Sequence, residues 1–375
     1  MHYLDNAATT KPGREAVAAA TDCLTADFGN PSSLHGVGRR ARESLEQARA
    51  RVAAALGVSP AELGRTGGGT EACNLALLGA AGPLRRRGGH LIASTLEHPA
   101  VAETMKALKE DGFALTLVPP GPEGRVRPEA VTAALREDTV LVSVMLVCNE
   151  TGAVNPVADI ARAVKAQNPR ALVHTDGVQG LFKVSCAPRA LGVDLLSVSA
   201  HKVGGLKGAG ALWRAPGARL TAVSRGGGQE GGLRSGTEAM PALAAFGAAC
   251  AARSAAFAGD TARMEGLKAR LLSGLAALPT ARVIPPHDAP HIVALSLPGY
   301  PGEVMARFLS DRGVYVSTGS ACHRGRRSEA LISMGLPPRT LDGVLRVSLC
   351  PDNAPEDIDA LLAGLAAGLE TLAHN

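Results

Sequence analysis

Residues 197–210 read Ser-Val-Ser-Ala-His-Lys-Val-Gly-Gly-Leu-Lys-Gly-Ala-Gly, and no other stretch of the chain is more informative. Lys202 stands just past an apolar strand expected over residues 193–198, with a hydroxyl, an imidazole and several glycines close in sequence. A lysine that forms a Schiff base needs this setting, because its amine must reach an aldehyde and nearby backbone must approach a phosphate closely. The alternative interpretation is a solvated loop lysine, since such lysines are common.

Strand and helix patterns alternate on both sides of this stretch, which indicates an α/β fold with a large, mostly parallel sheet. Strands are expected over residues 90–95, 115–118, 139–147, 171–175 and 193–198, and helices over 39–56, 72–78, 100–110 and 156–166. After about residue 255 the regular alternation of strand and helix patterns ends. Helices are expected there over 261–277, 302–312 and 355–372, and strands over 291–297, 314–317 and 344–348.

The length of 375 residues exceeds what one hydrophobic core usually supports, so two domains are expected. The prediction is a large domain over residues 15–255 and a smaller α+β domain formed by residues 1–14 and 256–375. Apolar residues make up 46% and charged residues 19%, which is a globular rather than a disordered composition.

Several functional classes find no support in the composition. The formal charge is +5, and no long Lys/Arg run is interleaved with aromatic residues, so nucleic-acid binding is not indicated. The seven cysteines form no Cys-x-x-Cys pair and no zinc spacing, so neither a metal site nor a disulfide scaffold is expected. The chain shows no signal-peptide pattern at its start and no uncharged apolar stretch of membrane-spanning length. These patterns predict a cytoplasmic protein that does not enter a membrane.

Candidate cofactor ligands lie where the predicted strands end, which is where open parallel sheets bind their ligands. Asp176 follows the strand at 171–175 and could pair with a protonated pyridine nitrogen, although a turn or N-cap aspartate is the alternative. Gln179 could hydrogen-bond a ring hydroxyl. The turn at residues 67–70 opens a helix and could cradle a phosphate, although glycine turns have many uses. Ser199 and His201 flank Lys202 and could add phosphate contacts.

Three further residues could handle a substrate. His98 follows the strand at 90–95 and could stack on a planar cofactor and move protons, although a lone loop histidine is more often surface. Asn149 would lie at the end of the apolar strand at 139–147. Arg346 interrupts an apolar strand and needs an anion, which is either a substrate carboxylate or an internal salt-bridge partner.

Cys322 lies among small residues and is followed by His323 and Arg324, which favour a reactive thiolate. Inert packing is the alternative for a cysteine. The short basic stretch at residues 324–327 could dock an acidic protein, or it is simply a solvated loop.

Taken together, these segments resemble the cysteine desulfurases, a family of class-V enzymes that use pyridoxal 5′-phosphate (PLP). The resemblance runs from residue 3 to about residue 360. It is carried, in family order, by Leu4-Asp5-Asn6-Ala7-Ala8-Thr9-Thr10, Phe28-Gly29-Asn30-Pro31-Ser32-Ser33-Leu34-His35, Gly68-Gly69-Thr70-Glu71, Glu97-His98, Asn149-Glu150-Thr151-Gly152, His174-Thr175-Asp176, Ser199-Ala200-His201-Lys202 and Arg234-Ser235-Gly236-Thr237-Glu238. Departures from the usual family residues occur at Cys148, Gly177, Gly231 and Cys350.

The resemblance implies a homodimer of the aspartate-aminotransferase fold, fold type I of the PLP enzymes, with its active site at the subunit interface. It implies that Lys202 carries PLP, that His98 stacks on the ring, and that Asp176 and Gln179 hold the ring. Phosphate would be bound by Gly69, Thr70, Ser199 and His201, together with Thr237 from the other subunit. The substrate would be held by Asn149, Arg346, Asn6 and Asn30.

The implied reaction removes sulfur from L-cysteine, releases L-alanine and leaves a persulfide on Cys322 for transfer to a sulfur-acceptor protein. Iron–sulfur cluster assembly and tRNA thiolation are both compatible destinations for that sulfur. Two other functions stay open at this point: a selenocysteine lyase or another C–S lyase on the same scaffold, and a non-catalytic protein that retains the fold.

Overall fold

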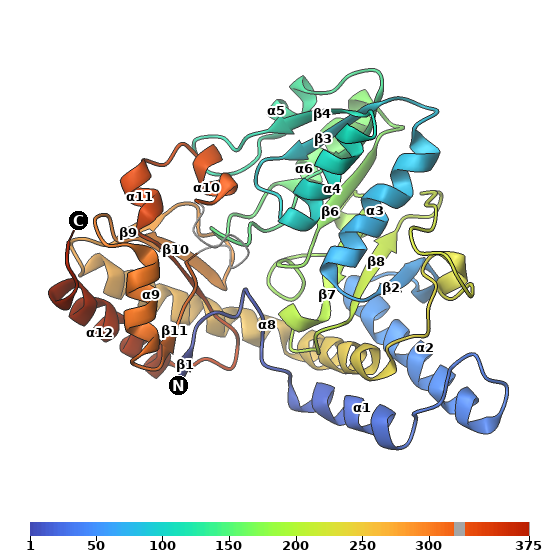
Figure 1. Cartoon of the computed structure of the whole chain (residues 1–375), viewed down its shortest axis with the longest axis horizontal. Helices are drawn as coiled ribbons and strands as arrows, with labels where there is room; N and C mark the ends of the chain where they lie inside the picture. The colour runs from blue at the N-terminus through green and yellow to red at the C-terminus, as the bar shows by residue number, and fades with distance from the viewer. Residues whose placement is uncertain (319–326, 375) are drawn as a thin grey trace.

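The computed structural model describes residues 1–318 and 327–374, and its larger sheet has seven strands in the order β2-β8-β7-β6-β5-β3-β4 (Figure 1). All neighbouring pairs are parallel except those of β8, which is antiparallel to both β2 and β7. The strands are β2 (Leu63–Thr66), β3 (His90–Ser94), β4 (Ala114–Val118), β5 (Thr139–Ser143), β6 (Leu172–Asp176), β7 (Leu195–Ser199) and β8 (Gly210–Arg214).

Helices cover both faces of this sheet, so its central strands are apolar on both sides. In β3, Leu91 and Ala93 pack with α3 (Gly69–Leu84) and α4 (Pro99–Glu110), whereas Ile92 belongs to the core on the opposite face. That opposite core is completed by residues of α2 (Gly36–Leu56), α6 (Val157–Gln167) and the start of α8 (Met240–Ala276). The remaining helices on the chain up to residue 200 are α1 (Arg14–Thr25), α5 (Pro128–Ala133) and α7 (Pro188–Leu191).

A second sheet lies in the C-terminal part of the chain, in the antiparallel order β12-β10-β9. Its strands are β9 (Arg282–Ile284), β10 (Ile292–Ser296) and β12 (Val344–Ser348), and its helices are α9 (Gly302–Ser310), α10 (Glu329–Ser333), α11 (Pro338–Asp342) and α12 (Pro355–Thr371). The N-terminus joins this part, because β1 (His2–Tyr3) pairs with β11 (Val314–Tyr315) and Leu4 is buried in its core.

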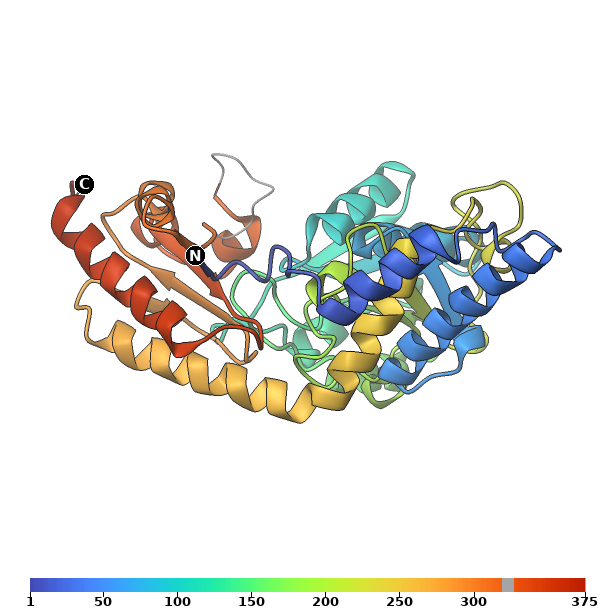
Figure 2. The same cartoon turned by 90° about the horizontal axis from the view of Figure 1, so that it is seen from below.

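The helix α8 runs without a break from the large sheet to the second sheet, as Figure 2 shows. The sequence pattern predicts a helix only over its second half, residues 261–277. The first half is rich in alanine and packs against both α1 and α2. Its apolar residues therefore occur on all sides of the helix, and the periodic apolar stripe that predicts a surface helix is missing. The predicted domain boundary at residue 255 therefore falls inside a continuous helix.

By length and composition alone, α8 is also apolar enough to cross a membrane. Buried core helices of soluble proteins pass the same test, and 44% of its most apolar stretch is buried inside the protein.

The strand predicted over residues 139–147 ends at Ser143. Its backbone continues to bond to β6, because Val144 N donates to His174 O and Leu146 N to Asp176 O. The chain then reverses, since Val147 bridges to Val154 in antiparallel fashion. This reversal places the following loop, which contains Asn149, at the carboxyl edge of the sheet.

The crossing of α8 over α2 depends on a glycine. A Cβ atom at Gly247 would lie 2.6 Å from the Cα atom of Ala48, whereas nothing lies within 4 Å of the same position at Gly259. We expect Gly247→Ala to lower the free energy of unfolding by about 1–3 kcal/mol, because overpacking outweighs the better helix propensity of alanine. Gly259→Ala is the matched control and should raise it by up to about 1 kcal/mol. Urea unfolding measures both, and a Gly247→Ala protein as stable as the wild type would contradict the packing argument.

Candidate active site

One cavity of about 320 Å³ lies at the carboxyl edge of the large sheet. The ends of β6 and β7, the first turn of α3 and the short 3₁₀ turn over Ala200–Lys202 all open onto it. It is lined by Ala7, Ala8, Gly69, Thr70, His98, Ala100, Met145, Val147, Asn149, Asp176, Val178, Gln179, Ser199, His201, Lys202 and Arg346. Most of the residues singled out in the sequence therefore meet in one place.

Three of the singled-out residues that the structure describes do not line this cavity. Cys322 lies outside the described residues. Asn30 and Thr237 are exposed. Asn6 is buried beside the second sheet, where its amide donates to the Ser348 carbonyl at 3.0 Å.

The Lys202 amine points at the N-terminal segment. Its Nζ atom donates to the Ala7 carbonyl at 2.6 Å and to the Ala8 carbonyl at 2.8 Å. The same segment is fastened to the turn that carries the lysine, since Thr10 Oγ1 donates to the His201 carbonyl and accepts from Gly204 N. The contacts of Ala7 and Ala8 were not predictable from the sequence, because every residue has a backbone carbonyl group.

A small polar hollow lies beside the first turn of α3. A Cβ atom at Gly69 would lie 2.8 Å from Val178 Cγ2 and 3.3 Å from Ser199 Cβ, so only glycine keeps this space open. The hydroxyl of Ser199 is buried here and has no hydrogen-bond partner among the described residues. A helix N-terminus with free N–H groups and an unpaired hydroxyl suits an anion.

His201 lines the same cavity. Burial, with the positive charge of Lys202, lowers the pKa of His201 to about 4. The imidazole is therefore neutral at pH 7, and it would offer an anion a hydrogen bond rather than a charge.

Asp176 is a buried carboxylate at the end of β6. Burial raises its pKa, and the charges of His98 and Lys202 together with a hydrogen bond from Val178 N at 2.9 Å work in the opposite direction. Cys73 on α3 also hydrogen-bonds this carboxyl group. A carboxylate at such depth requires a cationic partner to stay ionised.

Arg346 on β12 has only 3% of its surface exposed. Its Nη2 atom lies 2.9 Å from Asp5 Oδ1, and its Nη1 atom donates to the Asn149 carbonyl at 2.9 Å. The internal salt bridge that the sequence left open is thus present. The Nε atom is buried and lacks a partner within the part of the chain that the structure describes.

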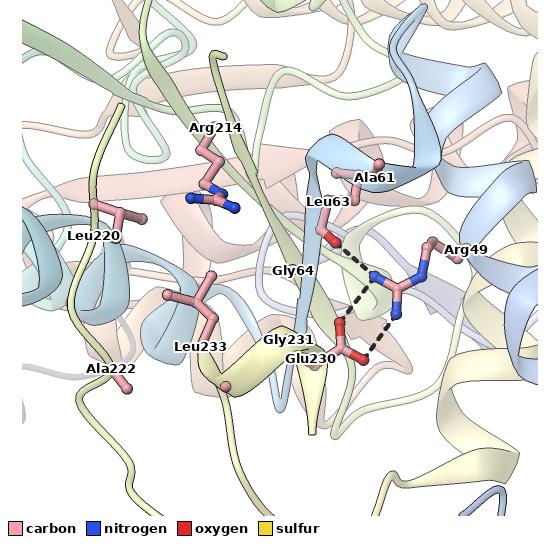
Figure 3. Close-up of a pocket in the computed structure, with 11 residues that line it drawn as sticks. Arg49, Ala61, Leu63, Gly64, Arg214, Leu220, Ala222, Glu230, Gly231 and Leu233 are labelled. Atoms are coloured by element: carbon pink, nitrogen blue, oxygen red, sulfur yellow. Dashed lines mark hydrogen bonds and ion pairs between the residues drawn. The ribbon is translucent and has the colours of Figure 1, made fainter. Parts of the chain in front are cut away.

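A second cavity, of about 280 Å³, lies beside β2 and the end of β8, and none of the predicted site residues line it (Figure 3). Its main feature is the carboxylate of Glu230, which bonds both Arg49 and Arg65. Gly231, one of the departures from the family pattern, lines this cavity. These ion pairs fix the glycine-rich segment that leads to Thr237.

Glu97 is a buried carboxyl group that the sequence analysis noted only as part of a motif. It accepts from Ser94 Oγ at 2.5 Å and from Met145 N at 2.7 Å, while its other oxygen has no partner among the described residues. Burial raises the pKa of Glu97 from 4.5 to about 8.

This shift predicts a pH-dependent stability. Glu97 holds its proton more tightly in the folded protein than in the unfolded chain, because its pKa is raised from 4.5 to about 8. Protonated Glu97 therefore contributes fully to the free energy of unfolding below pH 4.5, and this contribution is lost as the pH rises toward 8. Between pH 5 and pH 8, the wild type should therefore lose roughly 3 kcal/mol more free energy of unfolding than Glu97→Gln. Glu103→Gln, at an exposed position on α4, is the control and should behave like the wild type. Equal pH slopes for the wild type and Glu97→Gln in urea unfolding would refute the assignment.

Known proteins resemble the chain over nearly its whole length. The aminotransferase class-V family model matches residues 2–361. A NifS/IcsS protein homolog of Lactobacillus delbrueckii subsp. bulgaricus is 39% identical, covering 97% of this chain and 96% of that protein. A cysteine desulfurase IscS of Methanosarcina thermophila is 35% identical, covering 96% and 90%. A solved structure described as a NifS-like protein superposes with a TM-score of 0.94 at 37% identity, covering 99% of both chains. The chain therefore belongs to the class-V aminotransferase family, and within it to the cysteine desulfurases of the NifS and IscS type.

Proposed function

We propose that this protein is a PLP-dependent cysteine desulfurase that passes the sulfur of L-cysteine to an acceptor protein. The observation that carries the proposal is the convergence of Lys202, Asp176 and His98 on one cavity beside the N-terminus of α3. The relatives are named for the same activity.

The residues of the cavity fit PLP. The hollow at Gly69 and the unpaired Ser199 hydroxyl suit its phosphate, with Thr70 and neutral His201 as further donors. Buried Asp176 would hold the ring nitrogen in its protonated, cationic form, and that cation is the partner the carboxylate needs. When bound, PLP supplies an electron sink that weakens the bonds around the substrate carbon atoms.

The side chains of the protein then have distinct tasks. Lys202 Nζ binds the cofactor aldehyde and, once free, holds and moves a proton with the help of His98. Arg346 and Asn149 line the cavity and orient the substrate carboxylate. The family resemblance also assigns Asn6 and Asn30 to substrate binding, although neither lines the cavity of its own chain. The Nη2 atom of Arg346 already pairs with Asp5. The buried Nε–H group, which has no partner among the described residues, is therefore the donor we assign to the substrate carboxylate.

Cys322 is the proposed sulfur acceptor. Ser317, five residues before it, exchanges backbone hydrogen bonds with Arg346 in the wall of the cavity. Five extended residues span at most about 17 Å, so the cavity is within reach of the cysteine. The Cys322 thiolate forms an S–S bond to the substrate sulfur while the C–S bond breaks, and the released carbon takes a proton to give L-alanine. Of the basic residues at 324–327, Arg327 pairs with Asp342, and the other two arginines lie outside the described residues.

Replacing the acceptor cysteine tests this function. Cys322→Ser should retain the visible absorbance of bound PLP but reduce L-alanine formation from L-cysteine by about 100-fold or more, because the hydroxyl is a far weaker nucleophile toward sulfur. Cys350→Ser is the matched control at a partly exposed cysteine and should keep most of the activity. Amino-acid analysis of the product measures the effect. Full alanine formation by Cys322→Ser would overturn the nucleophile assignment.

We further propose that Thr237 completes the phosphate site of a second subunit, since it is exposed and does not line the cavity of its own chain. In a hybrid of Lys202→Ala and Thr237→Val chains, only the Thr237→Val subunit can bind PLP covalently. A partner-supplied threonine predicts wild-type PLP affinity for that subunit, while the Thr237→Val homodimer binds about 10-fold more weakly. Weak binding in the hybrid would place the threonine contact within one chain.

A further inference from the structure

His291 lies immediately before β10, on the second sheet, yet its ring contacts a residue that lines the cavity of the large sheet. Only 1% of its surface is exposed. Its Nε2 atom lies 3.1 Å from Oε1 of Gln179, which lines the cavity. The position of His291 is held by its own backbone, because its carbonyl accepts from Leu349 N at 2.8 Å.

The hydrogen bonds of Gln179 fix the direction of its amide group. Its Nε2 atom donates to the Ala7 carbonyl at 2.9 Å, and a carbonyl can only accept, so the nitrogen end faces Ala7. The oxygen end consequently faces His291, and His291 must donate from Nε2. One N–H of the Gln179 amide then remains for a ligand in the cavity.

The surroundings keep His291 in this donor state. Burial, with the charges of Lys183, Arg346, Lys268 and Lys202, holds the pKa of His291 well below its ordinary value. The ring is therefore neutral and carries a single N–H. Its Nδ1 atom is buried and has no partner among the described residues, so no competing bond pulls the proton to the other nitrogen.

We propose that His291 is a positioning residue, which holds the Gln179 amide so that an N–H, and not the carbonyl oxygen, faces the ring oxygen of PLP. This inference rests on the proposed function. Without the donor at position 291, the bond to the Ala7 carbonyl alone distinguishes the two ends of the amide. The amide oxygen then turns toward the cavity in a larger fraction of molecules, where it would repel the anionic ring oxygen. The second sheet thereby helps to set the electrostatics of a site built on the first.

The readout is the pH titration of the visible absorbance of bound PLP, which reports the proton shared between the ring oxygen and the nitrogen of Lys202. A donor to the ring oxygen stabilises the form that lacks this proton, so loss of the donor raises the midpoint. We expect His291→Leu to raise it by about one pH unit, from the usual strength of a hydrogen bond to a charged acceptor. His291→Gln, which presents an N–H at a similar reach, should stay near the wild type.

Two further variants separate positioning from folding. Gln179→Leu should raise the midpoint by itself, and adding His291→Leu to it should change the midpoint no further, because His291 acts through Gln179. His90→Leu removes another buried histidine, which bonds Thr139 and Thr116 far from the cavity, and it should leave the midpoint unchanged.

The outcomes distinguish this inference from the proposed function. A wild type that shows no visible PLP band refutes the function and the inference together. A wild type with the band, and a midpoint that is equal in the wild type and His291→Leu, overturns the inference alone. So does an additive effect in the double variant. If His291→Leu does not fold, the midpoints of the other two variants decide. A His291→Gln midpoint near that of the wild type, together with a raised Gln179→Leu midpoint, supports the inference. Any other pattern contradicts it.

Discussion

The parallel register of β6 and β7 is the constraint on which the site depends. It pairs Asp176, the last residue of β6, with Ser197, two residues before β7 ends at Ser199. The chain then needs only the short turn over Ala200–Lys202 to bring the amine into the same cavity. Because both strands end at one edge, a buried anion and a lysine that are far apart in sequence become neighbours.

The N-terminal segment closes this arrangement from outside the large sheet. Its carbonyls at Ala7 and Ala8 hold the Lys202 amine, and its Asp5 neutralises Arg346. The segment also carries β1, which belongs to the second sheet. The active cavity is consequently assembled from both parts of the chain, and a change at either sheet reaches the lysine through a few hydrogen bonds.

The buried polar groups around Asp176 explain one departure from the family pattern. A Cβ atom at Gly177 would lie 3.1 Å from the sulfur of Cys186, so the glycine leaves room for that thiol. On the other side, Cys73 bonds the Asp176 carboxyl group directly. These thiols place weakly polar sulfur atoms next to the carboxylate instead of water. Because water does not solvate the carboxylate there, its charge requires a cationic partner.

The sequence predicted those site residues that lie directly after an apolar strand or at the start of an apolar helix. Asp176 and Lys202 were predictable because each follows an apolar strand, and the turn before α3 was predictable because its glycines open an apolar helix. The continuity of α8 was not, since a helix buried on all sides shows no periodic stripe. His291 was hidden for a different reason: its partner Gln179 lies 112 residues earlier, and only the packing of the two sheets brings them together.

The central claim is that the Lys202 amine forms the covalent bond to PLP. Borohydride reduction of the PLP-loaded protein, followed by proteolysis and mass spectrometry of the labelled peptide, tests it most directly. The account predicts a single phosphopyridoxyl group on Lys202. A label on another lysine, or no label at all, would contradict it.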